Sequence, residues 1–192
     1  MEYQFLGIGI LTWITFLPIL GMIAVLVVPK SSDGALKWIP AAATFGQVVM
    51  AVMIYFGFNR GLDGINTVEG MNFVEKATWI DIQSVPWFGR IQIEYFLGVD
   101  GLSVTMVLLT ALISFIAVFA SWNIEKSLKG YMAMLLLLDT GMMGVFVSLD
   151  FFLFYVFWEV MLLPMYFLIG VWGGPRREYA AIKFFLYTLL GS

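Results

Sequence analysis

Long apolar runs alternate with short polar segments along this 192-residue chain. A helix needs about 20 mostly apolar residues to cross the roughly 30 Å hydrocarbon layer of a membrane. The pattern predicts such spans at 5–28, 38–58, 97–122, 131–149 and 151–172, and the start of another at 179–192. We therefore expect an all-α fold, a polytopic transmembrane helix bundle with five complete spans and the start of a sixth.

The first apolar run lacks the features of a cleaved signal peptide, and the last run is too short for a complete span. No basic residue precedes the first run, which is also too long for the apolar core of a signal peptide. The sixth run has 14 residues, about 21 Å at 1.5 Å per residue. A natural chain seldom stops inside a span, so we expect this sequence to be the amino-terminal part of a longer protein.

The long polar stretch at 59–96 separates the second and third spans. Apolar and polar side chains alternate at 91–95 and more weakly at 79–82, with Pro86 between the two stretches. This period of two is typical of strands, so the loop is predicted to hold a β-hairpin outside the membrane. The expected organisation is two helices in 1–58, the loop 59–96, and helices three to six in 97–192.

Composition strengthens the membrane assignment and removes several chemistries. The chain is 61% hydrophobic and only 12% charged, with a mean hydropathy of +0.94, whereas soluble domains carry about 25% charged residues. It has no cysteine and no histidine, so we expect no disulfide, structural zinc or iron–sulfur ligation within it. Ten scattered basic residues and a net charge of −3 do not form the basic stripe of a nucleic-acid-binding protein.

Lysine and arginine in the short loops predict the orientation of the bundle. The first, third and fifth loops carry the pairs Lys30 and Lys37, Lys126 and Lys129, and Arg176 and Arg177. The opposite side has Arg60, Lys76 and Arg90 spread along the long loop. The positive-inside rule therefore places the amino terminus and the hairpin outside, which is the periplasm of a bacterium.

Glu159 is the strongest functional candidate, because a carboxylate near mid-membrane costs roughly 3 kcal/mol or more unless it is paired, protonated or turned inward. It lies eight residues into the fifth span between aromatic and aliphatic side chains, and desolvation of this kind favours proton exchange near neutral pH. Pro164 cannot donate to the carbonyl of Val160, so a local helix defect there could admit water. The alternative is a permanently protonated acid that only joins helices.

Three aspartates flank or interrupt other spans. Asp139 lies near the middle of the fourth span, close to Gly141 and Gly144, where structural pairing and proton relay are both open. Asp150 precedes the fifth span and Asp100 precedes the third. Both positions favour helix capping, because a carboxylate is stabilised at the positive end of the helix dipole.

Lys183 lies in the first turns of the sixth span. A lysine near a helix end can extend its ammonium group to the interface, and a buried relay is the alternative. By axial rise it should lie about 10 Å shallower in the membrane than Glu159, so direct contact between the two is not expected, although a water bridge is possible.

The residues around these positions resemble a known family. The glycine–aspartate–glycine stretch LGVDGLS at 97–103 is similar to the start of the third helix in the antiporter-like subunits of respiratory complex I. The stretch SLDFFLFYVFWEVMLLPMYFL at 148–168, with GVWGG at 170–174 and AAIKFFLYT at 180–188, looks more specifically like subunit M of the proton-translocating NADH–quinone oxidoreductase. The likeness is expected from about 91 to 192, with only hydrophobic layout shared before it.

The resemblance implies an antiporter-like fold of two inverted repeats, of which this chain would hold the start of the first. It implies that protons move along buried glutamate and lysine side chains. Glu159 matches the family's fifth-helix glutamate, which tunes the pKa of a lysine on a later helix, and Lys183 matches its sixth-helix lysine. Asp139 matches no family site, and Asp150, Pro164 and Asp139 are at most supporting residues.

The function expected from this resemblance is proton translocation in the membrane arm, coupled to NADH oxidation and quinone reduction in other subunits. The chain itself would hold no cofactor, and FMN and iron–sulfur clusters would belong to partner subunits. Expected partners are other membrane-arm subunits, including neighbouring antiporter-like ones, in a bacterial inner membrane. The alternatives are a subunit of a multisubunit sodium/proton antiporter and a related membrane-bound hydrogenase, because they share the buried glutamate.

Overall fold

A computed structural model describes residues 4–5, 7–59, 61, 71–85 and 89–192, so Arg60 and Pro86 lie outside the described residues. Within these described residues, four strands and six helices follow one another as β1 (Gln4–Phe5), β2 (Ile8–Gly9), α1 (Ile10–Val27), α2 (Asp33–Gly57), β3 (Asn72–Val85), β4 (Gly89–Val99), α3 (Ser103–Ala120), α4 (Leu128–Val147), α5 (Phe151–Trp172) and α6 (Arg177–Gly191). Helices α1 to α5 are each long and apolar enough to cross a membrane. The predicted all-α polytopic bundle is confirmed, and α6 lies in the segment predicted to form the sixth helix.

Three predicted span boundaries need correction. The first span begins at Ile10 rather than at residue 5, because β1 and β2 pair as a small hairpin before it. The second begins at Asp33 rather than at residue 38. The third begins at Ser103, because residues 97–99 belong to β4. A short apolar run does not by itself distinguish a strand from a helix. Residues 97–99 lie in a paired strand, and the periodicity of the sequence could not show this pairing.

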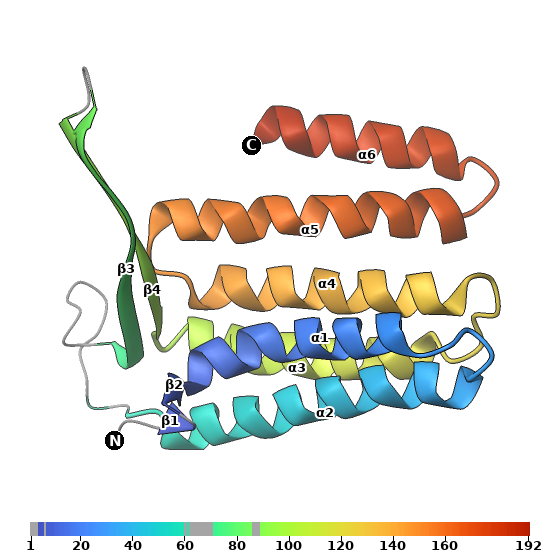
Figure 1. Ribbon diagram of the computed structural model, residues 1–192, viewed down its shortest axis with the longest axis horizontal. Coiled ribbons are helices and arrows are strands. Elements are labelled where there is room, and N and C mark those ends of the chain that lie inside the picture. Colours follow the sequence, from blue (N-terminus) through green and yellow to red (C-terminus); the bar gives the residue numbers. More distant parts are fainter. Residues whose placement is uncertain (1–3, 6, 60, 62–70, 86–88) are drawn as a thin grey trace.

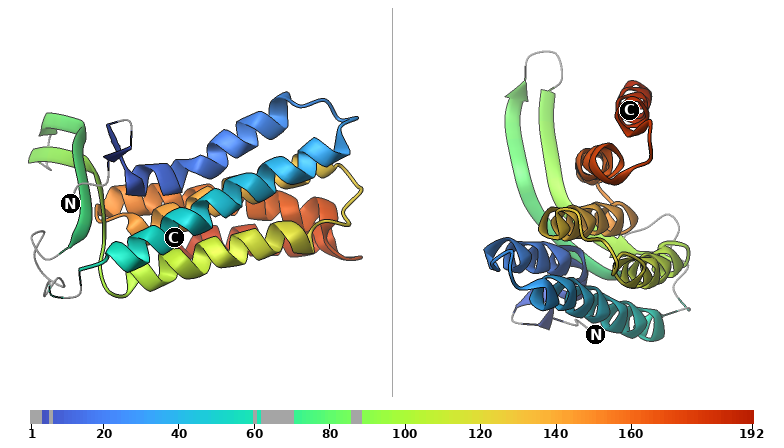
Figure 2. Two further views of the ribbon diagram at one scale, coloured as in Figure 1. Left: turned by 90° about the horizontal axis from the view of Figure 1, so that it is seen from below. Right: turned by 90° about the vertical axis from the view of Figure 1, so that its right-hand side faces the viewer.

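The helices run back and forth across one elongated bundle, and the β3–β4 hairpin crosses the end at which α1, α3 and α5 begin (Figure 1). The opposite end holds three short loops, and the paired basic residues lie in these loops or in the first turns of the helices that follow them. Seen along the helices, α1 to α4 form a cluster, and α5 and α6 extend from it as successive layers (Figure 2). Helix α5 therefore joins the cluster chiefly through α4, and α6 packs on α5.

Close packing of α4 against α5 depends on two glycines. A Cβ atom at Gly141 would lie 3.2 Å from the backbone oxygen of Phe157, and one at Gly144 would overlap the Phe157 ring. Small residues allow helices in membranes to approach closely. The buried cluster around Leu97, Val107, Met143 and Phe157 continues from this contact into the rest of the bundle.

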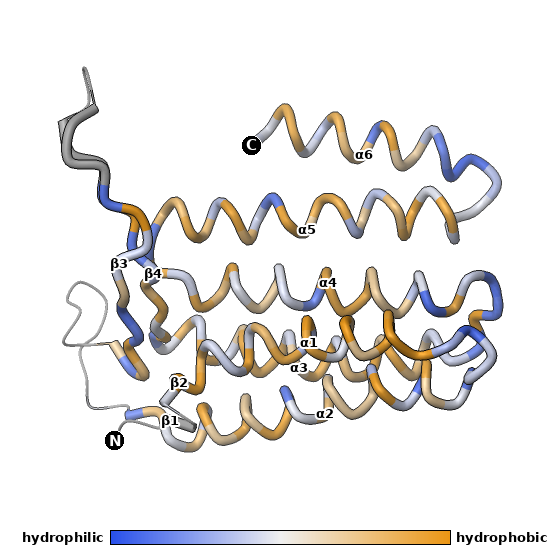
Figure 3. The backbone as a smooth tube through the Cα atoms, viewed as in Figure 1, coloured by the Kyte–Doolittle hydropathy of each residue, from blue (hydrophilic) through white to orange (hydrophobic). Residues whose placement is uncertain are grey.

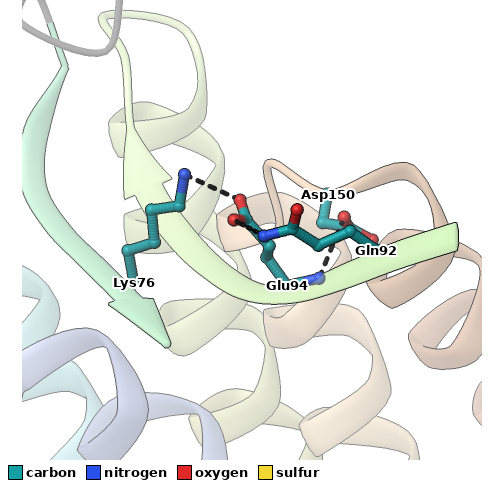
Figure 4. Close-up of polar contacts among 4 residues, drawn as sticks. All are labelled: Lys76, Gln92, Glu94 and Asp150. Atoms are coloured by element: carbon teal, nitrogen blue, oxygen red, sulfur yellow. Dashed lines mark hydrogen bonds and ion pairs between the residues drawn. The ribbon is translucent and has the colours of Figure 1, made fainter. Parts of the chain in front are cut away.

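The β3–β4 hairpin is an antiparallel pair with three register irregularities, and it is attached to the starts of two helices. Glu75 on β3 accepts hydrogen bonds from the backbone nitrogens of Leu11 (2.7 Å) and Thr12 (3.2 Å). It thereby caps α1, whose own N-cap residue supplies no side-chain bond. At the other helix, the Glu94 nitrogen donates to Asp150 Oδ2 at 3.3 Å, while Lys76 pairs with Glu94 at 2.8 Å (Figure 4).

Candidate functional site

Isolated hydrophilic positions interrupt the hydrophobic helices α2, α4, α5 and α6 (Figure 3). In the sequence these helices carry Gln47, Asp139, Glu159 and Lys183, respectively, away from their ends. Polar side chains at such depth are costly in a membrane and commonly mark ion pathways. The neighbours of each side chain therefore decide which chemistry it can perform.

Glu159 lies near the middle of α5 and is partly buried. One of its carboxylate oxygens, Oε1, is shielded from solvent and has no hydrogen-bond partner among the described residues. The Tyr155 side chain, one turn earlier on the same helix, is close enough to interact with the carboxylate. With one free oxygen in an apolar setting and a hydroxyl beside it, the carboxyl group is suited to accept a proton and pass it on.

Pro164 does not break α5, which is helical without interruption from Phe151 to Trp172. The helix therefore continues through the buried proline, and the predicted local defect is limited to one missing hydrogen bond. The ring still lacks an N–H group, so the Val160 carbonyl receives no hydrogen bond from residue 164. That carbonyl lies next to Glu159 in the sequence and remains an acceptor near the candidate site.

Lys183 is exposed on α6. Its Nζ atom lies 5.7 Å from the centre of the Tyr179 ring, a distance at which a cation and an aromatic face attract each other. It lines a pocket of about 860 Å³ between the end of α5 and α6, together with Arg176, Arg177 and Tyr187. The lysine is therefore accessible from the end of the bundle that carries the basic loops.

The two candidate proton-carrying residues are not in direct contact. Glu159 lies 13 residues before the end of α5, about 20 Å along the axis, whereas Lys183 lies six residues after the start of α6, about 9 Å from the same end. Among the described residues, no ion pair joins them. This offset agrees with the separation of about 10 Å expected from axial rise.

Asp150 and Asp100 are helix caps, as predicted. Asp150 Oδ1 accepts hydrogen bonds from the nitrogens of Phe152 (2.9 Å) and Leu153 (3.0 Å) at the start of α5. Asp100 Oδ1 accepts from Leu102 (3.0 Å) and Ser103 (2.6 Å) before α3. Because Asp150 also accepts from the hairpin, it fixes the start of the helix that carries Glu159.

Asp139 is 2% exposed and faces the α1–α4 cluster. Its Oδ1 accepts a hydrogen bond from the Ser114 hydroxyl of α3 at 2.5 Å, while Oδ2 has no partner among the described residues. The fully buried Gln47 side chain of α2 also interacts with this carboxyl. The sequence analysis did not identify Gln47 and Ser114 as candidates, because an uncharged polar side chain in an apolar run does not by itself indicate a functional site.

Comparison with known proteins shows what this chain is similar to. The model of the family described as "NADH:quinone oxidoreductase/Mrp antiporter, TM" matches residues 148–192. NADH-quinone oxidoreductase subunit M of Rhodobacter capsulatus is 40% identical over 188 residues, which is 96% of this chain and 34% of that protein. NAD(P)H-quinone oxidoreductase chain 4 1 of Synechococcus elongatus is 38% identical over 95% of this chain and 32% of its own length.

Solved structures share the fold. A chain of respiratory complex I from Thermus thermophilus superimposes with a TM-score of 0.66 at 21% identity, covering 94% of this chain and 33% of that one. A chain of the membrane-bound sulfane sulfur reductase, an archaeal respiratory membrane complex, gives a TM-score of 0.65 at 18% identity over 95% of this chain and 34% of its own length.

The similarity extends further than the motifs indicate. We expected sequence likeness only from about residue 91, but the alignment with the Rhodobacter subunit covers 96% of the chain, so the first two helices share more than hydrophobic layout. The chain spans about a third of the length of the curated relatives it matches. In sequence, the chain is similar to these subunits along nearly its whole length, and its fold is similar to that of the two membrane-complex chains.

Proposed function

We propose that this chain forms part of a proton-translocating membrane-arm subunit of an NADH–quinone oxidoreductase. The observation that carries the proposal is the Glu159 carboxyl group, which lies at mid-helix with one buried oxygen that has no hydrogen-bond partner among the described residues. A group in this state can change protonation without first breaking an ion pair. NADH oxidation and quinone reduction would take place in partner subunits that hold FMN and iron–sulfur clusters.

Lys183 would be the second proton-carrying group of this part of the subunit. The offset of about 10 Å along the helix axes is too large for direct transfer, so water or side chains beyond this chain would connect the two groups. The pocket beside Lys183 would allow water to reach the lysine from the basic-loop end of the bundle.

The proposed location is the inner membrane of a bacterium, among other antiporter-like and membrane-arm subunits. The basic pairs in three short loops at one end of the bundle support an orientation with that end in the cytoplasm. The amino terminus and the hairpin would then face the periplasm. Attachment of a labelling reagent to a cysteine placed in the hairpin or in a basic loop would report the side directly.

Replacement of Glu159 by glutamine tests the role of the carboxyl group. In membrane vesicles that hold the whole complex with the full-length subunit, we expect Glu159→Gln to lower NADH-driven proton transport by about tenfold or more, because an amide cannot exchange the proton. Glu178→Gln, an exposed change in the first turn of α6, is the matched control. A wild-type proton gradient in the Glu159→Gln vesicles, with the complex assembled, would refute the role.

A sodium/proton antiporter subunit is the alternative, because the matched family model includes the Mrp antiporters. The relatives described above are quinone oxidoreductase subunits, which favours the respiratory assignment. Mass spectrometry of the complex purified in mild detergent separates the two. Flavin and iron–sulfur subunits as companions support the respiratory complex, and antiporter subunits without redox proteins contradict it.

A further inference from the structure

Two hydrogen bonds that run in opposite directions join the end of α5 to the loop between α3 and α4, at the end of the bundle away from the hairpin (Figure 1). Trp172, the last residue of α5, donates from its indole nitrogen to the Lys126 carbonyl at 2.6 Å. Lys126 donates from Nζ to the Val171 carbonyl at 3.0 Å. Each side chain binds the backbone of the other segment, and we call the pair Lys126 and Trp172 the α5 clamp.

These contacts differ from the usual roles of the two residue types near a membrane surface. Tryptophan at a helix end commonly lies among lipid headgroups, and lysine commonly extends its ammonium group to water. Here the indole N–H of Trp172 and the ammonium group of Lys126 both donate to main-chain oxygens of the protein. The ammonium group also lies at the negative end of the α5 dipole, and α5 has no basic residue of its own in its last turn.

An aromatic contact and a further hydrogen bond extend this joint to α4 and α3. The Trp172 ring meets the Tyr131 ring of α4 edge to face, with 5.2 Å between the ring centres. The Tyr131 hydroxyl lies 2.8 Å from the hydroxyl of Ser121, the C-cap residue of α3. The ends of α3, α4 and α5 are thus connected through side chains at the same end of the bundle.

The start of α5 is attached separately, at the hairpin end. Asp150 caps the helix and accepts a hydrogen bond from the Glu94 nitrogen of β4 at 3.3 Å. The Leu149 nitrogen donates to the Phe96 carbonyl of the same strand at 2.9 Å. Glu159 lies between this attachment and the α5 clamp. The two attachments together therefore limit how far α5 can tilt or rotate, and with it the Glu159 carboxyl group.

The α5 clamp also determines where α6 begins. Helix α6 packs on α5, and the turn between them starts directly after Trp172. Ile169 and Gly173, on either side of Trp172 in the chain, line the pocket beside Lys183. The Gly173 nitrogen donates to the Ile169 carbonyl at 2.9 Å, which keeps the turn close to the helix end. Holding Trp172 in place therefore holds one wall of the pocket that Lys183 lines.

We propose that Lys126 and Trp172 are positioning residues for proton transfer, because their reciprocal bonds hold the end of α5 and the α5–α6 turn in the arrangement that Glu159 and Lys183 require. The inference rests on the proposed function of these two groups and adds the residues that fix their helices. Trp172 lies about 20 Å along the axis from Glu159. A change far from the reacting groups still matters, since a misplacement of about 1 Å can lower a rate by about 100-fold.

Proton transport tests the proposal in vesicles that hold the whole complex with the full-length subunit. Trp172→Phe and Lys126→Met each remove one donor of the α5 clamp, and we expect each to lower NADH-driven transport per assembled complex by about threefold or more. Lys126→Arg keeps a cationic donor and should restore transport close to that of the wild type. Trp38→Phe and Lys30→Met are the matched controls, because they make the same changes on exposed side chains of α2 and the loop before it.

The pH profile of the remaining transport separates positioning from a loss of stability. A loss of folded subunit lowers transport by the same factor at every pH, whereas a changed arrangement of the proton-carrying groups moves the pH of maximal transport. We expect Trp172→Phe to move this maximum and Lys126→Arg to leave it in place. An unmoved maximum in Trp172→Phe would overturn the proposal, whether or not the transport rate falls.

Trypsin cleavage tests the α5 clamp without reference to Glu159. The turn after Trp172 and the start of α6 contain Arg176 and Arg177, after which trypsin cuts, and cleavage of a folded protein follows local opening. In the detergent-solubilised complex, we expect Trp172→Phe to accelerate cleavage there by about threefold or more, and Trp38→Phe to leave it unchanged. Equal rates in Trp172→Phe and wild type would overturn the inference.

The cleavage rate also separates failure of this inference from failure of the proposed function. Faster cleavage in Trp172→Phe, together with a wild-type proton gradient in Glu159→Gln, would refute the proposed function and with it the positioning role, although the α5 clamp exists. A lost gradient in Glu159→Gln with unchanged cleavage in Trp172→Phe would support the proposed function and refute the inference alone.

Discussion

Glu159 and Asp139 are both carboxylic acids near the middle of apolar helices, yet they have different neighbours. Asp139 is enclosed by α1 to α4 and bonded to Ser114, whereas Glu159 is only partly buried, with Tyr155 beside it. A site that exchanges protons needs access to water or to a further carrier. At the scale of the single residue, Glu159 therefore meets this requirement better than Asp139 does.

Replacement of Lys183 by arginine or by methionine tests whether the lysine exchanges a proton. Arginine keeps the positive charge but does not release its proton in proteins, since its pKa exceeds about 12. If Lys183 carries protons, both variants should lower NADH-driven proton transport by about tenfold or more. If the lysine only provides charge at the interface, Lys183→Arg should behave as wild type, and Lys30→Arg serves as the matched control in the first loop.

The caps at the helix starts follow directly from sequence position. Asp150 and Asp100 stand immediately before helical runs, and both accept backbone hydrogen bonds there. The cap on α1 differs, because Glu75 lies 64 residues away from Leu11 in the chain. Local sequence can predict a cap that stands immediately before its own helix. It cannot predict a cap supplied by a strand, because that contact exists only after the hairpin has packed on the helix.

At the scale of the elements, the hairpin contact also perturbs Tyr95 on β4. The pKa of Tyr95 is raised from 10.0 to about 12; burial is the largest cause, a hydrogen bond with Thr12 opposes it, and the Glu75 carboxylate adds to the increase. The Tyr95 hydroxyl lies 2.8 Å from the Thr12 hydroxyl. The phenol is therefore held in its neutral form where β4 meets the start of α1.

This pKa gives a signed pH prediction. The folded-state pKa is raised, so the stabilisation from neutral Tyr95 is complete below pH 10 and is lost as the pH rises from about 10 to about 12. Glu75→Gln should lower the pKa of Tyr95 but leave it above 10, because burial is the larger cause. Tyrosinate absorbance after a rapid pH jump, with Tyr95→Phe subtracted, measures it.

The control for this titration is Glu94→Gln on the same strand. The Glu94 carboxylate pairs with Lys76 and is not among the causes of the Tyr95 shift, so this variant should leave the Tyr95 titration unchanged. An equal shift in both variants would show that the general charge of the hairpin, and not the Glu75 contact, acts on Tyr95.

At the scale of the whole molecule, α5 and α6 depend on α4 for their attachment to the remaining helices. The attachment passes through Gly141, where a methyl group would come within 3.2 to 3.3 Å of the α5 backbone. Helix backbone cannot rotate away as a side chain can. Any side chain at this position would therefore move α5, and Glu159 with it, away from the cluster.

Gly141→Ala is expected to destabilise the folded subunit by about 1–3 kcal/mol, the usual cost of overpacking. Gly34→Ala is the matched control, because a Cβ there meets nothing within 4 Å and alanine is the better helix former. Thermal unfolding of the detergent-solubilised complex compares the two. Equal midpoints would contradict the role of the glycine contact.

The sequence by itself determined the number of membrane helices, their approximate limits, the caps at Asp150 and Asp100, and the positions of Glu159 and Lys183. These features depend on properties of a local run of residues: its length, its apolarity and the residue type at its start. The offset between Glu159 and Lys183 also followed, because axial rise is fixed by helix geometry. The strand character of residues 97–99 did not follow, because a short apolar run fits either element.

Only the tertiary structure decided which polar groups meet. Ile14, Gln47, Ser114 and Asp139 come from four different helices, and their hydrogen bonds depend on how those helices are rotated against each other. Glu75 caps a helix that begins far before it in the chain for the same reason. Apolar patterning specifies that a helix is buried in the membrane, but its rotation is set by packing against its neighbours, since lipid and protein interior are equally apolar.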